Sequence, residues 1–378
     1  MGEGFSMKAK KIGIVTHYYG SVNYGGCLQA YALTHVLNEM GYDACQISYD
    51  FRSKHPPRKR SLKDRVREMI ERVFYSGRFK KRSRAFVAFR NAVPHSEKVY
   101  DDDSIGETAD LYDVFITGSD QVWNTSWYHS AFFLDFVNNG KMKLSYAASL
   151  GRPTLSEAER EKMRKSLADF SAISVREQDA VPLVSDLTEK PVEWTLDPTL
   201  LLSPDKWNEV VSERKIKQKY LFCYFLSTDK RTRRLATEYA REKGLVVVTL
   251  PHFPATFSKN DFMFGDVHLY DVTPSDFISL IKNAECVFTD SFHAAVFSNL
   301  YEKEFFVFDR LYASEMKTRI LTLLPLFGTE ARFCREEEFT LSHLLSAQKI
   351  EYGKAPERFD SLVKSSRDFI KNAIETEL

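Results

Sequence analysis

Short apolar runs alternate with segments of helical spacing along most of this chain. Residues 11–16 (KIGIVT) are β-branched and apolar, which is typical of a strand buried in a parallel sheet. Helical spacing follows over 28–40, and the next apolar run is 45–49. A helix is predicted to begin at Ser156, because Glu159 completes a capping pair. The same alternation predicts four more strands, at 114–117, 144–147, 172–175 and 192–196.

The series starts again after about residue 215. Further strands are predicted at 220–226, 245–250, 286–289 and 305–308. Helices are predicted between them at 231–243, 275–283 and 290–299. Two such series predict an α/β protein with two Rossmann-like lobes facing across a cleft. We expect the first lobe to cover 1–205 and the second 216–378 with a terminal helix, joined by the polar stretch 203–219.

The polar residues that follow the predicted strands are the first candidates for a binding site. In open α/β sheets the ligand lies beyond the carboxyl ends of the strands. This rule predicts where a ligand binds but does not indicate which reaction takes place there. The positions are 17–26, 118–124, 148–152, 176, 251–252, 290–293 and 309–310.

Two motifs in the first lobe contain groups that suit a sugar or an anion. The turn 20–26 (GSVNYGG) would present backbone N–H groups at a helix N-terminus, although a tight βα turn explains its glycines equally well. In 117–124 (TGSDQVWN), polar side chains would bind sugar hydroxyls and Trp123 would stack on a sugar ring; alternatively, Asp120 caps a helix and Trp123 fills the core. The predicted acceptor-binding residues are Asn23, Tyr24, Gly25, Gly26, Asp120, Gln121, Trp123 and Asn124.

Two residues in later motifs suit catalysis. His293 falls in the first turn of a predicted helix after a buried strand, where a histidine can exchange protons near neutral pH; a structural role is the alternative. Arg176 follows the strand 172–175, where a guanidinium can bind carboxylate or phosphate; the alternative is an ion pair with Glu177 or Asp179. No clustered His, Cys or carboxylate motif suggests a metal.

Composition excludes several classes of protein. A net charge of +1 argues against a nucleic-acid binder, and the apolar runs are too short to span a membrane. The five cysteines are scattered and form no CxxC pair, which predicts free thiols in a reducing cytoplasm. Residues 1–10 lack the apolar core of a signal peptide, so we expect a cytoplasmic protein that begins naturally at Met7.

The segment 52–90 differs from the rest of the chain, with 15 Lys or Arg against 3 Asp or Glu. Its apolar residues fall at helical spacing, which predicts a basic helical insertion in the first lobe. A solvated helical hairpin is one interpretation. A surface for anionic lipid at the inner face of the membrane, or for a diphosphate-linked substrate, is another, and RNA binding is a third.

Taken together, the ordered motifs of the chain resemble the polysaccharide pyruvyl transferase family. The resemblance extends from about residue 11 to about residue 335. It implies a fold similar to the GT-B glycosyltransferases, phosphoenolpyruvate as donor, and a saccharide acceptor of a bacterial surface polysaccharide, lipid-linked or not. The product would be a pyruvate ketal, formed without a cofactor. The motifs are NYGGCLQAYAL (23–33), FITGSDQVWN (115–124), YAASLG (146–151), ISVRE (173–177), LDPTLLL (196–202) and TDSFHAAVFS (289–298).

The resemblance also implies roles for individual residues. His293 matches the family's catalytic histidine, and Arg176 matches an arginine implicated in donor binding. The sequence departs from the family at Ser291, where many members have arginine. Either another cation supplies this charge (Arg310, Arg319 or Lys317) or the donor differs. The full predicted donor-binding set is Arg176, His252, Asp290, Ser291 and Arg310.

Two other functions remain open at this point. A glycosyltransferase of the same architecture would bind a nucleotide-sugar in the second lobe, with Asp290 and Arg310 near the diphosphate and ribose. A carbohydrate-binding protein without catalysis would bind sugar but no donor, which Ser291 makes a real alternative.

Overall fold

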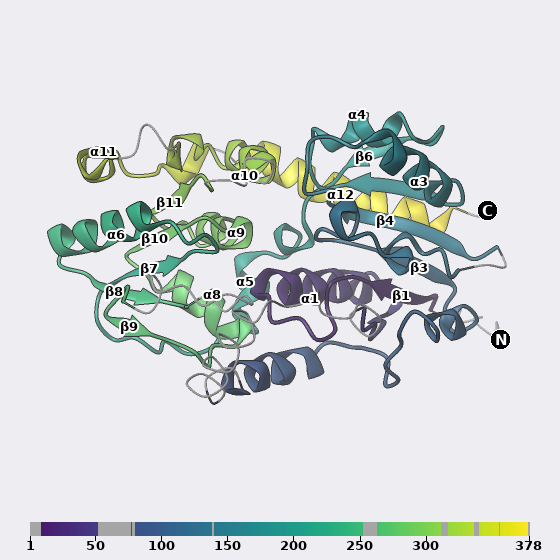
Figure 1. Ribbon diagram of the computed structural model, residues 1–378, viewed down its shortest axis with the longest axis horizontal. Coiled ribbons are helices and arrows are strands. Elements are labelled where there is room, and N and C mark those ends of the chain that lie inside the picture. Colours follow the sequence, from purple (N-terminus) through teal and green to yellow (C-terminus); the bar gives the residue numbers. More distant parts are fainter. Residues whose placement is uncertain are drawn as a thin grey trace, which may run out of the picture.

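The computed structural model describes residues 9–51, 77, 80–137, 140–251, 263–310, 317–335, 340–354 and 356–376. Its strands form two six-stranded sheets, one in each half of the chain (Figure 1). The two α/β lobes expected from the sequence are therefore confirmed. The predicted insertion at 52–90 lies outside the described residues except for residue 77 and the helical residues 80–90.

The first sheet is parallel throughout and has the order β2-β1-β3-β4-β5-β6. Its strands are almost entirely apolar because helices cover both faces. Ile14 in β1 pairs with Ile116 in β3, which places the residues after both strands at the same edge. The strands are β1 (Lys11–Val15), β2 (Asp43–Gln46), β3 (Val114–Thr117), β4 (Met142–Ala148), β5 (Ala172–Val175) and β6 (Val192–Trp194).

The second sheet repeats this plan in the order β12-β11-β10-β7-β8-β9, again parallel. Its two edge strands have two residues each, too short for apolar periodicity to predict them. The strands are β7 (Tyr220–Tyr224), β8 (Val246–Thr249), β9 (Val267–His268), β10 (Cys286–Thr289), β11 (Phe305–Phe308) and β12 (Phe333–Cys334).

The helices pack on both faces of each sheet. In the first lobe, α3 (Glu157–Leu167) and α4 (Ala180–Ser185) cover one face and α1 (Tyr24–Glu39) the other. The predicted capping box of Ser156 and Glu159 at the start of α3 is confirmed. In the second lobe, α6 (Lys230–Lys243) and α11 (Leu341–Ser346) lie opposite α8 (Pro274–Lys282), α9 (Phe292–Leu300) and α10 (Thr318–Leu323).

The helix predicted at 275–283 begins one residue earlier, at Pro274, and is capped by Thr273. The Thr273 hydroxyl accepts from the N–H of Asp276, and Pro274 occupies the first helical position. A proline suits that position because its missing N–H has no helical partner there.

Helix α1 lies between the lobes and joins them through apolar contacts (Figure 1). Twelve of its sixteen residues are buried, because α8 and α9 of the second lobe cover the side that a surface helix would expose. The ring of Tyr24 stacks on Phe277 of α8 at 4.7 Å. Trp207, in the short helix α5 (Pro204–Asn208), packs against Tyr31 of α1 and Phe297 of α9. A continuous core therefore connects the two lobes.

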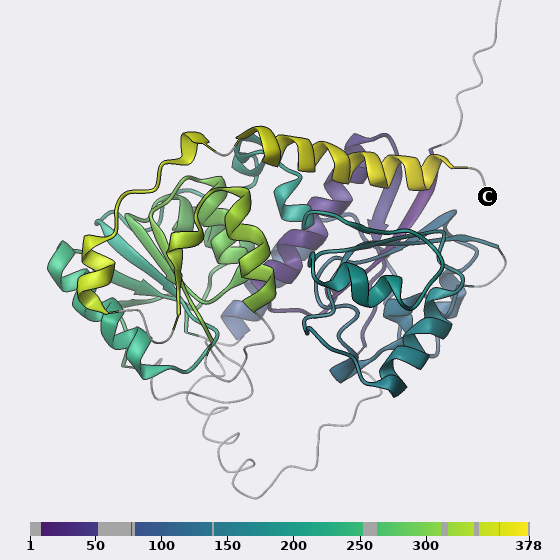
Figure 2. The ribbon, with the colours of Figure 1, turned by 90° about the horizontal axis from the view of Figure 1, so that it is seen from above.

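The last helix, α12 (Pro356–Glu375), returns from the second lobe to the first (Figure 2). Phe369 contacts the ring of Tyr146 in β4, and the Ser366 hydroxyl accepts from the N–H of Leu196. Lys10 donates to the carbonyl of Ile374 at 2.6 Å. The terminal helix assigned by sequence to the second lobe thus packs on the first, because its apolar side complements β4. No helix among the described residues is long and apolar enough to cross a bilayer.

Candidate active site

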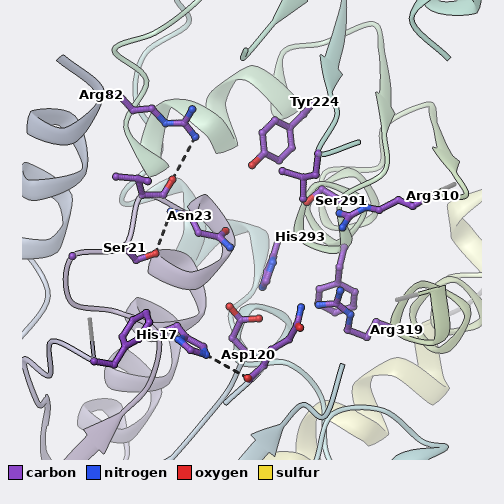
Figure 3. A pocket seen from close by; sticks show the side chains of 16 residues that line it. His17, Ser21, Asn23, Arg82, Asp120, Tyr224, Ser291, His293, Arg310 and Arg319 are labelled. Carbon is purple, nitrogen blue, oxygen red and sulfur yellow. Dashed lines mark hydrogen bonds between the residues drawn. The ribbon is translucent and has the colours of Figure 1, made fainter. Parts of the chain in front are cut away.

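A cleft of about 510 Å³ lies where the carboxyl ends of the two sheets face each other. The first lobe contributes the loops after β1 and β3, and the second lobe the residues after β7, β10 and β11. Figure 3 shows the polar side chains converging on this space from both lobes. The titratable and polar residues that line it include His17, Asp120, Ser291, His293, Arg310 and Arg319.

His293 reaches from the first turn of α9 onto helix α1 of the other lobe. A Cβ at Gly25 would overlap the Nδ1 atom of His293, so only glycine leaves room for the ring. The glycine in NYGG is therefore explained by a contact between lobes as well as by a turn. The opposite nitrogen, Nε2, lies 3.7 Å from Oδ2 of Asp197 and makes no hydrogen bond with any described residue.

Behind the histidine, a buried cluster of charges joins the ends of β5 and β6. Arg176 Nη1 donates to Asp197 Oδ2 at 2.9 Å, and Nε lies 3.3 Å from Glu177 Oε1. Burial opposes the charge of Arg176, but Glu177, Asp197 and Asp120 more than offset it and raise its pKa. Burial likewise opposes ionisation of Asp197, yet His293 and Arg176 hold its pKa well below the usual range. Asp197 therefore contacts both predicted catalytic residues.

This cluster changes the expected role of Arg176. Its side chain is only 2% exposed, and it is not among the residues that line the cleft. Its Nη1 and Nε atoms face Asp197 and Glu177, whereas Nη2 makes no hydrogen bond with the described residues and lies 3.7 Å from Asp120. The guanidinium lies over the ring of Phe292 at 4.9 Å. The interpretation as an ion pair with Glu177 is confirmed, with Asp197 as a second partner. The geometry gives Arg176 the task of positioning Asp197.

Arg319, at the start of α10, supplies the cleft with a cation that has no ion pair among the described residues. The residue is 6% exposed and makes no hydrogen bond or ion pair with the described part of the chain. Burial is the largest effect and, with Arg176 and Arg310, lowers its pKa to about 10, although Glu177 and Asp120 oppose this shift, so Arg319 stays charged at neutral pH. A buried charge without an ion-pair partner is costly. An anion bound in the cleft would offset this cost.

Arg310 stands beside Arg319 at the end of β11 (Figure 3). Its Nε donates to the carbonyl oxygen of Asp290 at 3.0 Å, which fixes the side chain. Both arginines line the same cleft as Ser291, the position where the family resemblance implies an arginine. Two cations from other elements are therefore present in the cleft.

Several predicted site residues lie elsewhere. Trp123 is fully buried, stacks on Phe133 and donates to the carbonyl of Phe132, so it fills the core. Tyr24 belongs to the core between the lobes, as described above. Both carboxylate oxygens of Asp290 accept backbone N–H groups, from Leu226 and Ser227. These three side chains have structural partners and do not line the cleft.

The other predicted residues line the cleft, lie next to it or fall outside the described residues. Asn23, Asp120 and Gln121 line the cleft, as do His293, Ser291 and Arg310. Asn124 lies just behind it and donates to the side chain of Gln121 at 2.8 Å. Gly25 and Gly26 lie under the cleft in α1. His252 lies outside the described residues.

Sequence reasoning missed four residues of the site. His17 and Asp197 follow predicted strands but received no role, and Arg319 was named only as a substitute cation. Arg82 lines the cleft from the helical residues 80–91, bridging the carbonyls of Val22 and Pro251. His17 and Asp197 could have been predicted as site residues because each directly follows a predicted strand. Among the described residues, no group of three or more His, Cys, Asp or Glu is arranged to hold a metal.

Comparison with known proteins identifies the family. The family model for polysaccharide pyruvyl transferases matches residues 23–312. That range includes both lobes and most of the cleft. The chain belongs to the polysaccharide pyruvyl transferase family and is a transferase enzyme. No curated protein matches it.

Solved structures share the fold at low sequence identity. A protein assigned as a UDP-N-acetylglucosamine 2-epimerase from Listeria monocytogenes superimposes with a TM-score of 0.51 at 13% identity, covering 98% of each chain. The UDP-N-acetylglucosamine 2-epimerase from Rickettsia bellii gives 0.48 at 11% identity, covering 96% of this chain and 98% of that one. The two-lobed α/β fold expected from the sequence is confirmed by the two sheets of the structure and shared by the Listeria protein.

Proposed function

We propose that this enzyme transfers the pyruvyl group of phosphoenolpyruvate to two hydroxyls of a saccharide, forming a ketal. The acceptor would be part of a surface polysaccharide or of its precursor. The observation that carries the proposal is the buried, unpaired guanidinium of Arg319 beside Arg310 in the cleft. Phosphoenolpyruvate carries a carboxylate and a phosphate, and guanidinium groups bind both in bidentate geometry.

The remaining residues fit the proton transfers that this reaction needs. Protonation of the methylene carbon makes the adjacent carbon electrophilic, so that a sugar hydroxyl adds to it. We assign this proton to His293, whose ring lies in the cleft with Nε2 3.7 Å from Asp197. A carboxylate beside an imidazole orients the ring and stabilises its protonated form. Gln121, Asn23 and Ser21 offer hydrogen bonds for the acceptor on the first-lobe wall.

Thermal unfolding with candidate donors tests the proposal. Phosphoenolpyruvate at 100 times its dissociation constant should stabilise the protein by about 2.7 kcal/mol, a shift of several degrees. Inorganic phosphate and a panel of nucleotide-sugars form the parallel arms. A shift with phosphoenolpyruvate that exceeds the shift with phosphate supports the donor. A shift in melting temperature with a nucleotide-sugar alone favours a glycosyltransferase. No shift with any donor favours a carbohydrate-binding protein.

Replacing Gly25 with alanine should impair catalysis through His293. Alanine normally stabilises a helix interior by about 0.5–1 kcal/mol over glycine, but here its Cβ would overlap Nδ1 of His293. Displacement of a catalytic group by about 1 Å can cost about 10²-fold in rate, which is the expected loss in kcat for Gly25→Ala. Phosphate release in the presence of phosphoenolpyruvate and acceptor measures it.

The matched control is Gly106→Ala, because no atom lies within 4 Å of a Cβ at Gly106. This variant should retain full activity. If Gly25→Ala also retains full activity, the contact between α1 and His293 does not position the ring for catalysis.

A further inference from the structure

A second histidine lines the same cleft from the first lobe. His17 follows β1, and its ring packs against Phe132 at 4.5 Å and Phe51 at 5.4 Å. The carboxylate of Asp120 acts on both His17 and His293, which reach the cleft from opposite lobes (Figure 3). His17 therefore lies on the wall that also carries the candidate acceptor-binding groups.

The hydrogen bond of His17 fixes which ring nitrogen is available. Its Nε2 lies 3.3 Å from the backbone carbonyl oxygen of Gln121. A carbonyl oxygen can only accept, so Nε2 carries the proton and Nδ1 of the neutral ring has the lone pair. Among the described residues nothing donates to Nδ1. His17 thus presents a basic nitrogen that the fold itself does not use.

The surroundings of His17 favour the neutral ring. Burial is the largest effect and lowers its pKa below the ordinary value of 6.5, although Asp120 and the Gln121 carbonyl oppose it. Phe51 and Phe132 shield one side of the ring, and His129 packs on the same two phenylalanines. A neutral imidazole at physiological pH accepts protons and does not donate them from Nδ1.

We propose that His17 is the general base that takes the proton of the attacking acceptor hydroxyl at Nδ1. This inference rests on the proposed pyruvyl transfer and adds a second catalytic residue to it. In this scheme His293 donates a proton to the methylene carbon of the donor, and His17 receives a proton from the acceptor hydroxyl. Two histidines on opposite lobes suit a reaction whose two substrates meet in the cleft.

The protons and bonds balance with these two residues. His293 gives a proton to the methylene carbon, the first hydroxyl oxygen bonds to the neighbouring carbon, and that hydroxyl proton moves to His17. The second hydroxyl then bonds to the same carbon as the carbon–oxygen bond to phosphate breaks. One proton returns to His293, and the proton on His17 leaves with the phosphate. The products are the ketal and inorganic phosphate.

The variant His17→Gln separates base catalysis from structure. A glutamine amide can still donate to the Gln121 carbonyl, but it has no basic nitrogen. We expect kcat to fall by about 10²–10⁴-fold, while the dissociation constant for phosphoenolpyruvate, measured by calorimetry, changes less than about twofold. In the wild type, kcat/KM should fall as pH drops through the pKa of His17, below 6.5, because the base becomes protonated. This acidic limb should be absent from the residual activity of His17→Gln.

The control variant is His129→Gln, which removes an imidazole from the same aromatic cluster outside the cleft lining. It should keep kcat within about threefold of the wild type. If His17→Gln does the same, or if its acidic limb persists, the proposal is overturned.

A measurement independent of activity tests the tautomer. In protein labelled with ¹⁵N-histidine, the two-bond correlations of His17 should show protonated Nε2 and unprotonated Nδ1 at pH 7, and they should vanish in His17→Gln. A proton on Nδ1 would overturn the assignment of the base. Failure of phosphoenolpyruvate to bind the wild type would instead overturn the proposed donor, so the two failures are distinguishable.

Discussion

Replacing His293 with glutamine is expected to lower kcat for pyruvyl transfer by about 10²–10⁴-fold, the usual contribution of a positioned acid or base. Glutamine occupies a similar volume above Gly25 and can still donate an amide hydrogen toward Asp197, but it cannot deliver a proton. Steady-state phosphate release with phosphoenolpyruvate and a saccharide acceptor measures the loss.

The same variant should leave folding nearly intact. The imidazole of His293 stabilises the buried carboxylate of Asp197, but a glutamine amide can still donate toward that carboxylate, so we expect the free energy of unfolding to change by less than about 1 kcal/mol. The control is His35→Gln, a half-buried histidine of α1 that stacks on Tyr31 and lies 3.2 Å from Glu39, away from the cleft lining. A loss of stability that accounts for the loss of activity would contradict the catalytic assignment.

The location of this site could be predicted from the sequence, because it depends on local pattern. Parallel strands are apolar runs, and their carboxyl ends meet at one edge of a sheet. His293, Asp120 and Gln121 follow such runs, and all three line the cleft. The order of the motifs then indicated the family, which the match over 23–312 confirms.

The partners of individual side chains could not be predicted in this way. Asp290 also follows a strand, yet its carboxylate accepts hydrogen bonds from two N–H groups of the loop after β7, about 64 residues away in sequence. Trp123 lies within a polar motif, but the chain around Phe132 and Phe133 encloses it. Arg319 gives no strand-end signal because it enters the cleft from a helix. Each outcome depends on contacts between distant segments.

Arg319→Met is expected to raise the stability of the ligand-free protein and to weaken its binding of phosphoenolpyruvate. The guanidinium is buried, lies near Arg176 and Arg310, and forms no ion pair with a described carboxylate, although Glu177 and Asp120 offset part of the repulsion. Replacing such a charge with an apolar side chain of similar length should stabilise the apoprotein by about 1–3 kcal/mol. Thermal unfolding without ligand measures this gain.

The ligand response should change in the opposite direction. Hydrogen bonds to charged groups contribute about 1.5–3 kcal/mol each, and 1.4 kcal/mol corresponds to about tenfold in affinity. We therefore expect the dissociation constant for phosphoenolpyruvate to rise by about 10–100-fold or more in Arg319→Met. The control is Arg234→Met on α6, whose side chain is 70% exposed and which should change neither quantity.

A gain in stability of the ligand-free protein together with a loss of phosphoenolpyruvate affinity distinguishes a binding residue from a structural one. If Arg319 only supported the fold, its removal would lower the melting temperature and leave phosphoenolpyruvate affinity per folded molecule unchanged. If it holds the donor, the protein tolerates a destabilising charge in the empty cleft because the bound anion neutralises it. Arg319→Lys should then retain part of the affinity, since it keeps the charge but loses the planar fork that matches a carboxylate or phosphate.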